Sequence, residues 1–259
     1  EQMLKDRELA KKKIIQAVKL AEKMGAEITG LGAFTASVTN GGKEIVSQTK
    51  TFITSGNSLT AGITISEIDK ILKDKNFKNF RLAIIGATTP IGSVISKILS
   101  SKYNLNSLIL VGKTPFHINE LKNEISRSNK SLTIISTTNL DNIRMADVII
   151  TTTSAKGSNI QSNHLKQNAV VYDIAQPKNI SEDIINQRKD VKFIDGGLIS
   201  TPGINYHFNF GIPRETAFGC LAETMILAAE NIQDNYSLDK IESQKVEEIL
   251  ELARKYNFI

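Results

Sequence analysis

The residue best suited to covalent chemistry is Cys220, the one cysteine among 259 residues. It lies in the helix-like segment PRETAFGCLAETMILAAE, residues 213–230. A thiolate is a good nucleophile and a good leaving group, so it can hold an acyl group as a thioester whose carbonyl accepts a hydride. A lone cysteine among Ala, Phe, Leu and Met is also a common buried packing residue. The residues by themselves leave both roles open.

A glycine-containing loop gives the second chemical signal. In IIGATTPIGSVISKIL, the loop GATTPIG joins a strand-like segment to a helix-like one. The first glycine permits a tight turn, the last permits close helix–strand packing, and the helix N-terminus attracts a pyrophosphate. Thr89 stands where the usual fingerprint has a middle glycine. The alternative is a glycine turn without a ligand. We predict a phosphate loop of Gly86, Ala87, Thr88, Thr89, Pro90, Ile91 and Gly92.

The end of the next strand-like segment indicates which dinucleotide binds. An acidic residue there would hydrogen-bond the ribose of NAD, but LVGKTPF offers Lys113 and Thr114, and no carboxylate precedes Glu120. A cation and a hydroxyl suit the 2′-phosphate of NADP. A plain surface lysine is the alternative. We predict NADP(H) rather than NAD(H).

Six short apolar segments alternate with helix-like segments after residue 80, which predicts a Rossmann-like α/β fold with a doubly wound parallel sheet. We expect an N-terminal substrate-side α/β region at 1–75, an NADP-binding domain at 80–200 and C-terminal helices at 201–259. The predicted strands are RLAIIGA, SLILVGK, LTIIS, DVIITTT, AVVYDIA and VKFIDGG.

Loops at the ends of the later strands should also face the cofactor, because ligands of such sheets bind beyond the carboxyl ends of the strands. TTTSAKG follows the fourth strand, DIAQPKN the fifth and DGG the sixth. Ordinary strand-to-helix turns are the alternative. The predicted additional cofactor residues are Thr153, Ser154, Ala155, Asp195, Gly196 and Gly197.

Two N-terminal loops, GLGAFTAS and TSGNSLTAG, combine small residues, hydroxyls and a helix start. This combination suits contacts to a substrate carbonyl or phosphate, although turn formation alone also explains it. The chemistry of Tyr172, His207 and Thr35 makes them candidate proton donors. The predicted substrate residues are Gly32, Phe34, Thr35, Gly56 and Asn57.

Composition limits the class of protein. Hydrophobic residues make up 41% and charged residues 23%, and no apolar run is long enough for a membrane span. We expect a cytoplasmic protein, because a single cysteine fits a reducing compartment and the start lacks a signal peptide's apolar centre. The net charge of +5 comes without a basic, aromatic-rich stripe, so we expect no nucleic-acid partner, and the three scattered histidines predict no metal site. Because Glu1 is not Met, we expect an N-terminal part to be missing.

Several motifs together resemble the cyanobacterial-type long-chain acyl-[acyl-carrier-protein] reductases and the wider group of predicted amino acid dehydrogenases. The resemblance runs in order over nearly the whole chain. It is carried by LGAFTASV, TSGNSLTA, GATTPIG, PKN (177–179), DGG, AFGCLAETMIL and KVEEILELARKYNF.

This resemblance implies that Cys220 takes an acyl group from acyl carrier protein or acyl-CoA, and that NADPH reduces the resulting thioester to an aldehyde. The net positive charge would then suit an acidic carrier protein. Two other functions stay open. One is an amino-acid or shikimate-type dehydrogenase without covalent catalysis, and the other is a non-catalytic nucleotide-binding module.

Overall fold

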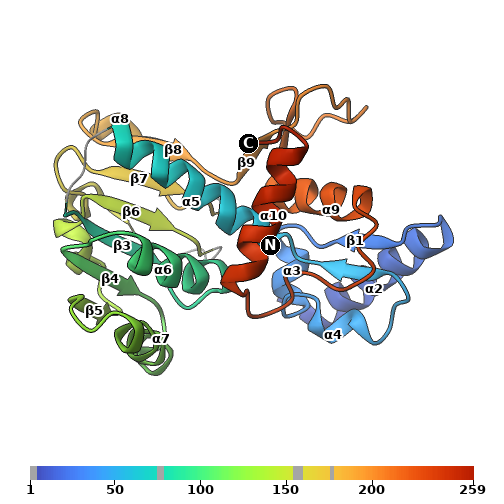
Figure 1. Cartoon of the computed structure of the whole chain (residues 1–259), viewed down its shortest axis with the longest axis horizontal. Helices are drawn as coiled ribbons and strands as arrows, with labels where there is room; N and C mark the ends of the chain where they lie inside the picture. The colour runs from blue at the N-terminus through green and yellow to red at the C-terminus, as the bar shows by residue number, and fades with distance from the viewer. Residues whose placement is uncertain (1–4, 75–78, 154–159, 176–177) are drawn as a thin grey trace. The chain divides into compact units, whose positions relative to one another are not determined.

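The structure is a computed structural model that describes residues 5–74, 79–153, 160–175 and 178–259. The chain folds into two compact units (Figure 1). Unit 1 combines residues 1–63 with residues 198–259, and unit 2 comprises residues 64–197. The N-terminal and C-terminal segments, which the sequence presents as separate regions, therefore belong to one unit.

Unit 2 contains a six-stranded parallel sheet in the order β5-β4-β3-β6-β7-β8. The order reverses between β3 and β6, as in dinucleotide-binding sheets, and this confirms the predicted Rossmann-like fold. Five strands lie within the segments predicted from the sequence, and β5 extends one residue beyond LTIIS, to Thr137. The strands are β3 (Arg81–Ile85), β4 (Ser107–Val111), β5 (Ile134–Thr137), β6 (Val148–Thr151), β7 (Val170–Asp173) and β8 (Lys192–Asp195).

The central strands are buried on both faces, which explains their continuous apolar runs. Side chains alternate across the sheet, so Ala83, Ile109 and Val171 share one face and pack in a core cluster with Ile143 and Leu165. Helices α6 and α7 contact each other and the strands β3 and β4 (Figure 1). The remaining elements of unit 2 are α6 (Pro90–Lys102), α7 (Pro115–Ser128), η1 (Leu140–Met145), η2 (Ser162–His164) and α8 (Glu182–Gln187).

Unit 1 is built from short strands and helices at both ends of its sequence. Strands β1 and β2 pair in parallel, and β9 and β10 pair antiparallel. Helix α5 (Asn57–Asp74) begins in unit 1 and continues into unit 2. The other elements are α2 (Arg7–Lys23), β1 (Ile28–Gly30), α3 (Phe34–Val38), α4 (Lys43–Val46), β2 (Phe52–Thr54), β9 (Leu198–Ser200), β10 (Thr216–Phe218), α9 (Gly219–Ala229) and α10 (Ser243–Lys255).

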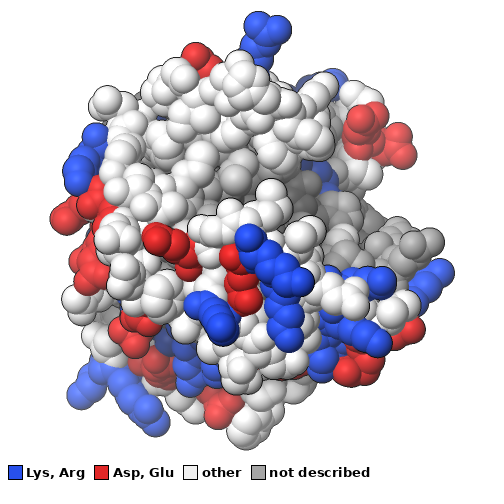
Figure 2. Space-filling model, turned by 90° about the vertical axis from the view of Figure 1, so that its right-hand side faces the viewer, with Lys and Arg blue, Asp and Glu red and all other residues white. Residues whose placement is uncertain are grey.

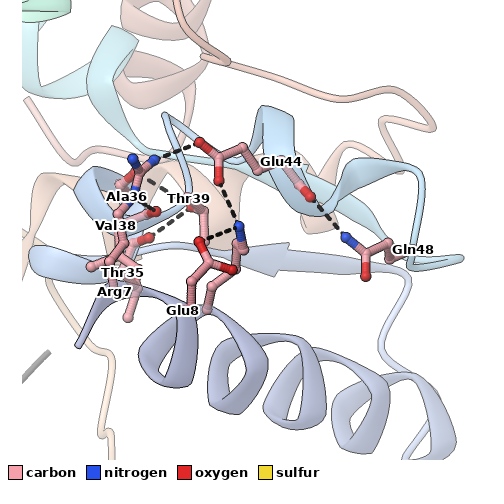
Figure 3. Close-up of polar contacts among 9 residues, drawn as sticks. Arg7, Glu8, Thr35, Ala36, Val38, Thr39, Glu44 and Gln48 are labelled. Atoms are coloured by element: carbon pink, nitrogen blue, oxygen red, sulfur yellow. Dashed lines mark hydrogen bonds and ion pairs between the residues drawn. The ribbon is translucent and has the colours of Figure 1, made fainter.

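Polar contacts fix the short helix α3 to its neighbours (Figure 3). Arg7 on α2 donates to the carbonyl of Val38, the last residue of α3, at 2.9 Å, and pairs with Glu44 on α4. Thr39 donates its hydroxyl to the carbonyl of Thr35 at 2.7 Å. Because α3 has only five residues, these outside partners are needed to satisfy its end. These bonds hold α3 in place, and with it the preceding loop, in which Gly32 lies next to Cys220.

Candidate functional site

The phosphate loop follows β3 in unit 2 and has the backbone geometry that its glycines predicted. Gly86 has φ +81°, a conformation that favours glycine. A Cβ at Gly92 would lie 2.3 Å from the carbonyl oxygen of Gly86, so only glycine lets α6 begin this close to the strand. The loop leaves the side chain of Thr88 exposed. These features fit a dinucleotide pyrophosphate at the N-terminus of α6.

Thr89 has a defined role in this loop. It is the N-cap of α6, and its hydroxyl oxygen accepts from the Gly92 N–H at 3.0 Å. The same hydroxyl lies 2.9 Å from the hydroxyl of Thr152, which in turn donates to the Gly86 carbonyl at 2.9 Å. The threonine in the place of the middle glycine therefore joins the loop after β3 to the loop after β6, where the strand order reverses.

The other predicted cofactor residues occupy several strand ends of unit 2. Lys113 and Thr114 are exposed after β4, and Thr114 is the N-cap of α7. Thr153 follows β6, while Ser154 and Ala155 lie outside the described residues. These strands are parallel, so their carboxyl ends share one edge of the sheet with the phosphate loop.

The glycine pair after β8 has a packing role. A Cβ at Gly196 would lie 2.4 Å from the ring of Tyr172, so glycine is required for this contact, and Gly197 has φ +84°. Burial raises the pKa of Tyr172, and its hydroxyl bonds to Thr64 and to the backbone of Gly197. Tyr172, one of the candidate proton donors, is therefore buried within unit 2.

Lys178, which is not among the residues predicted from the sequence, bonds to the ends of β7 and β8 beside Gly196. Lys178 donates to the carbonyl of Asp173 at 3.3 Å and pairs with the exposed Asp195. Burial lowers the pKa of Lys178. Asp173 is itself buried and accepts from the N–H groups of Ala175 and Asn179. These bonds fix the loop after β7 to the end of β8.

Cys220 lies in unit 1 as the second residue of α9, immediately after the helix start. The backbone N–H groups of Leu221, Cys220 itself and Ala33 act to lower the pKa of its thiol. A helix N-terminus and converging N–H groups favour negative charge, so this position stabilises a thiolate or an oxyanion formed beside it. Burial opposes this effect and dominates, and Glu223 adds to it, so the pKa of the Cys220 thiol is raised.

Two of the predicted substrate residues pack directly on the cysteine. A Cβ at Gly56 would lie 2.1 Å from the Cα of Cys220, and one at Gly32 would lie 3.3 Å from its sulfur. We call Gly32, Ala33, Gly56, Cys220 and Glu223 the Cys220 cradle. Its glycines are explained by close backbone approach rather than by turn formation alone.

Ala33 holds an unusual backbone conformation within the cradle, with φ 48° and ψ −126°. Such conformations are rare for residues other than glycine, and the few cases cluster at functional sites. The backbone N–H of this residue is one of those that act to lower the pKa of the Cys220 thiol. Next to it, Thr35 donates its hydroxyl to the Gly32 carbonyl at 2.6 Å, which holds the turn.

Glu223 connects α9 to the TSGNSLTA segment and is fully buried. Its carboxylate accepts from the Leu59 N–H at 2.7 Å, from the Ser237 hydroxyl at 2.7 Å and from the Thr54 hydroxyl. Burial raises its pKa, and these donors oppose the shift. The carboxylate thereby holds the start of α5 beside the start of α9. The sequence placed Glu223 three residues after Cys220 but gave no sign of its partners.

The remaining predicted residues also belong to unit 1. Phe34 begins α3, and Asn57 begins α5 next to Gly56; both are half-buried. His207 is exposed on the connection between β9 and β10, with φ 50°. Within the described ranges, no cluster of three or more His, Cys, Asp or Glu side chains is suited to hold a metal ion.

Residues 66–195, about half of the chain, match the sequence model of the shikimate / quinate 5-dehydrogenase family. The chain belongs to this family. Membership supports the class of Rossmann-type oxidoreductases that use NAD(P), in agreement with the strand order and the phosphate loop of unit 2.

Two curated proteins match almost the whole chain. The aminotransferase PigE of a Serratia species is 28% identical over 267 residues, which cover 100% of this chain but 31% of PigE. A long-chain acyl-[acyl-carrier-protein] reductase of Synechococcus elongatus is 26% identical and covers 96% of this chain and 76% of its own length. The chain therefore spans about a third of the first relative and about three quarters of the second.

Among solved structures, quinate dehydrogenase from Corynebacterium glutamicum in complex with NAD is similar over 57% of this chain and 54% of its own, with 14% identity and a TM-score of 0.42.

Proposed function

We propose that this protein reduces acyl thioesters to aldehydes with NADPH, through a thioester on Cys220. The observation that carries the proposal is the position of Cys220 at the start of α9, packed against Gly32 and Gly56, where the helix N-terminus and nearby backbone N–H groups favour a thiolate. Similarity over 96% of the chain to an acyl-[acyl-carrier-protein] reductase supports the same substrate class.

The cradle can perform the acyl-transfer half of the reaction. The Cys220 thiolate attacks the carbonyl carbon of the incoming thioester, a new carbon–sulfur bond forms, and the bond to the carrier's sulfur breaks. The carrier leaves as a thiol with the proton that Cys220 gave up. N–H groups of Ala33, Cys220 and Leu221 are suited to stabilise the oxyanion formed in this exchange.

Residues of unit 2 would hold the cofactor. The phosphate loop and the N-terminus of α6 would bind the pyrophosphate, and Lys113 with Thr114 would bind the 2′-phosphate of NADPH. Bound NADPH would supply the hydride that releases the acyl group as an aldehyde.

The charge of the protein gives only weak support for one acyl donor over another. Net charge is +5, but Lys and Arg side chains are interspersed with Asp and Glu on the face shown in Figure 2. Acyl carrier protein or acyl-CoA are both proposed donors. Replacing individual surface lysines with glutamate should slow acyl transfer from acyl carrier protein more than transfer from acyl-CoA. Only acyl carrier protein would dock through an extended acidic surface of its own, which these lysines would contact.

The deciding experiment is intact-protein mass spectrometry after incubation with palmitoyl-CoA or palmitoyl carrier protein without NADPH. We expect a mass increase equal to one acyl group, its absence in Cys220→Ser, and its discharge as aldehyde when NADPH is added. A folded, NADPH-binding protein that forms no adduct would contradict the proposal.

Family membership favours a second candidate, a dehydrogenase of hydroxy or amino acids without a covalent step. This function needs the sheet and the phosphate loop of unit 2 but not the thiol. It predicts that Cys220→Ala retains full turnover on such a substrate, whereas thioester reduction predicts complete loss.

A further inference from the structure

The connection between β9 and β10 in unit 1 lines an open cavity that the proposed chemistry does not use. Its volume is about 720 Å³, and it is lined by residues between 203 and 216. This volume falls in the range of small-molecule sites, roughly 300–1,000 Å³.

Three aromatic side chains gather in this cavity. The rings of Tyr206 and Phe210 meet edge to face with centroids 5.7 Å apart, and those of Phe208 and Phe210 are 4.8 Å apart. Phe208 is nevertheless 69% exposed and Phe210 41% exposed. Contiguous apolar surface of this kind is unfavourable in water and marks a place that binds an apolar partner.

Many polar groups around the rings are already bonded within the connection. Tyr206 donates its hydroxyl to Thr201 at 2.7 Å, and the side chains of Asn205 and Asn209 accept from the N–H groups two residues later. Glu215 accepts from the Gly203 N–H at 3.1 Å and so closes the base of the connection. Among the lining residues that stay exposed, Phe208 and Phe210 supply the apolar surface available to a ligand.

The connection is continuous with the helix that carries Cys220. Thr216 lines the cavity and begins β10, which pairs with β9, and α9 starts at the residue after Phe218. Thr216 is four positions before Cys220 in the chain, so their Cα atoms are at most about 14 Å apart. The extended alkyl chain of a long acyl group bound to the sulfur can span such a distance.

We infer that the segment 201–215 binds the alkyl chain of the acyl substrate. The inference rests on the proposed function, because it takes the acyl group on Cys220 as the ligand. It adds a preference for long, unbranched apolar chains, which the rings of Phe208 and Phe210 would cover.

A fluorescence experiment tests this site without requiring turnover. The chain has no tryptophan, so Phe210→Trp introduces a single reporter. In the Cys220→Ser background, which cannot form the thioester through sulfur, we expect a saturable blue shift of its emission with palmitoyl-CoA and none with acetyl-CoA. The matched control is Phe116→Trp, at a phenylalanine on α7 that is 65% exposed, and its emission should not change.

A second variant connects the site to acyl transfer. Phe208→Ala with Phe210→Ala should slow acylation of Cys220 by palmitoyl-CoA about tenfold or more, because the chain loses its apolar contacts. Alkylation of Cys220 by iodoacetamide should stay unchanged, which shows that the double variant is folded.

The outcomes separate the two proposals. A Cys220 adduct at an unchanged rate in the double alanine variant, with no emission shift in Phe210→Trp, would overturn the chain-binding site and leave the proposed function intact. A saturable shift without any adduct in the wild-type protein would support the apolar site and contradict the thioester step. A shift that follows protein concentration in the absence of acyl-CoA would identify a second copy as the occupant and overturn the inference.

Discussion

The phosphate loop and the Cys220 cradle both depend on glycines that admit close backbone contact, but they are assembled differently. Gly86 and Gly92 lie in one continuous segment, and the clash that excludes a Cβ at Gly92 comes from Gly86 itself. In the cradle, Gly56 packs on Cys220, and the bond between Thr54 and Glu223 spans 169 positions. The loop is a local structure with one long-range fastening, whereas the cradle exists only when distant segments of unit 1 have folded together.

Because of this difference, substitutions in the two sites should have different effects. Substitutions in the loop should have small effects on stability and on cofactor binding, because strand and helix hold its ends. Damage to the cradle should reduce the stability of unit 1 and the reactivity of Cys220 together. The following predictions run from the largest expected effect to the smallest.

Gly56→Ala should destabilise the protein by roughly 3–5 kcal/mol, from overpacking against backbone together with a strained positive φ of 72°. Chemical denaturation followed by circular dichroism measures this change. The matched control is Gly25→Ala, where φ is 89° but no atom lies within 4 Å, so only the strain remains and the expected cost is about 1–2 kcal/mol. Equal costs at the two positions would show that the contact with Cys220 is not required.

Glu223→Ala should cost about 3 kcal/mol, because it leaves the buried donors of Leu59, Ser237 and Thr54 without their acceptor. Glu223→Gln should cost about 1 kcal/mol, since its amide oxygen still accepts and the two hydroxyls can reorient. Denaturation measures the stability, and iodoacetamide alkylation measures how far Cys220 has become accessible. Similar losses in both variants would argue against hydrogen bonding as the role of Glu223.

Alkylation of Cys220 should accelerate about tenfold for each pH unit between pH 7 and pH 9, because burial raises the thiol pKa and only the thiolate reacts. At neutral pH the reaction should be slower than that of glutathione, whose thiol is exposed. Mass spectrometry of samples quenched over time gives the rates. A rate that is constant over this range would mean that the thiolate already predominates at neutral pH and that the N–H groups outweigh burial.

Thr89→Ala should cost about 1 kcal/mol, the usual value of an N-cap, and should weaken NADPH binding only a few-fold. Thr89→Ser keeps the capping hydroxyl and should retain most of the stability. Thermal unfolding and NADPH titration measure the two effects. A loss of stability in Thr89→Ala as large as that in Gly56→Ala would remove the contrast between the two sites.

Much of unit 2 could be predicted because its signals are local. The six strands are short apolar runs buried on both faces, and such runs stand out in the sequence whatever their partners are. The phosphate loop was recognisable because its two glycines, its strand and its helix are adjacent. The helical segment between β5 and β6 is a 3₁₀ helix, η1, which an apolar pattern in the sequence does not distinguish from an α-helix of this length.

The sequence by itself determined the Rossmann-like order of elements, the phosphate loop and the presence of one thiol in a helical segment. Only the tertiary structure decided that this thiol lies at the start of its helix, that Gly32 and Gly56 pack against it, and that Glu223 and Ser237 bond the start of α5. The physical reason is that strands and turns follow from neighbouring residues, whereas a buried carboxylate is tolerated only where the whole fold supplies its donors.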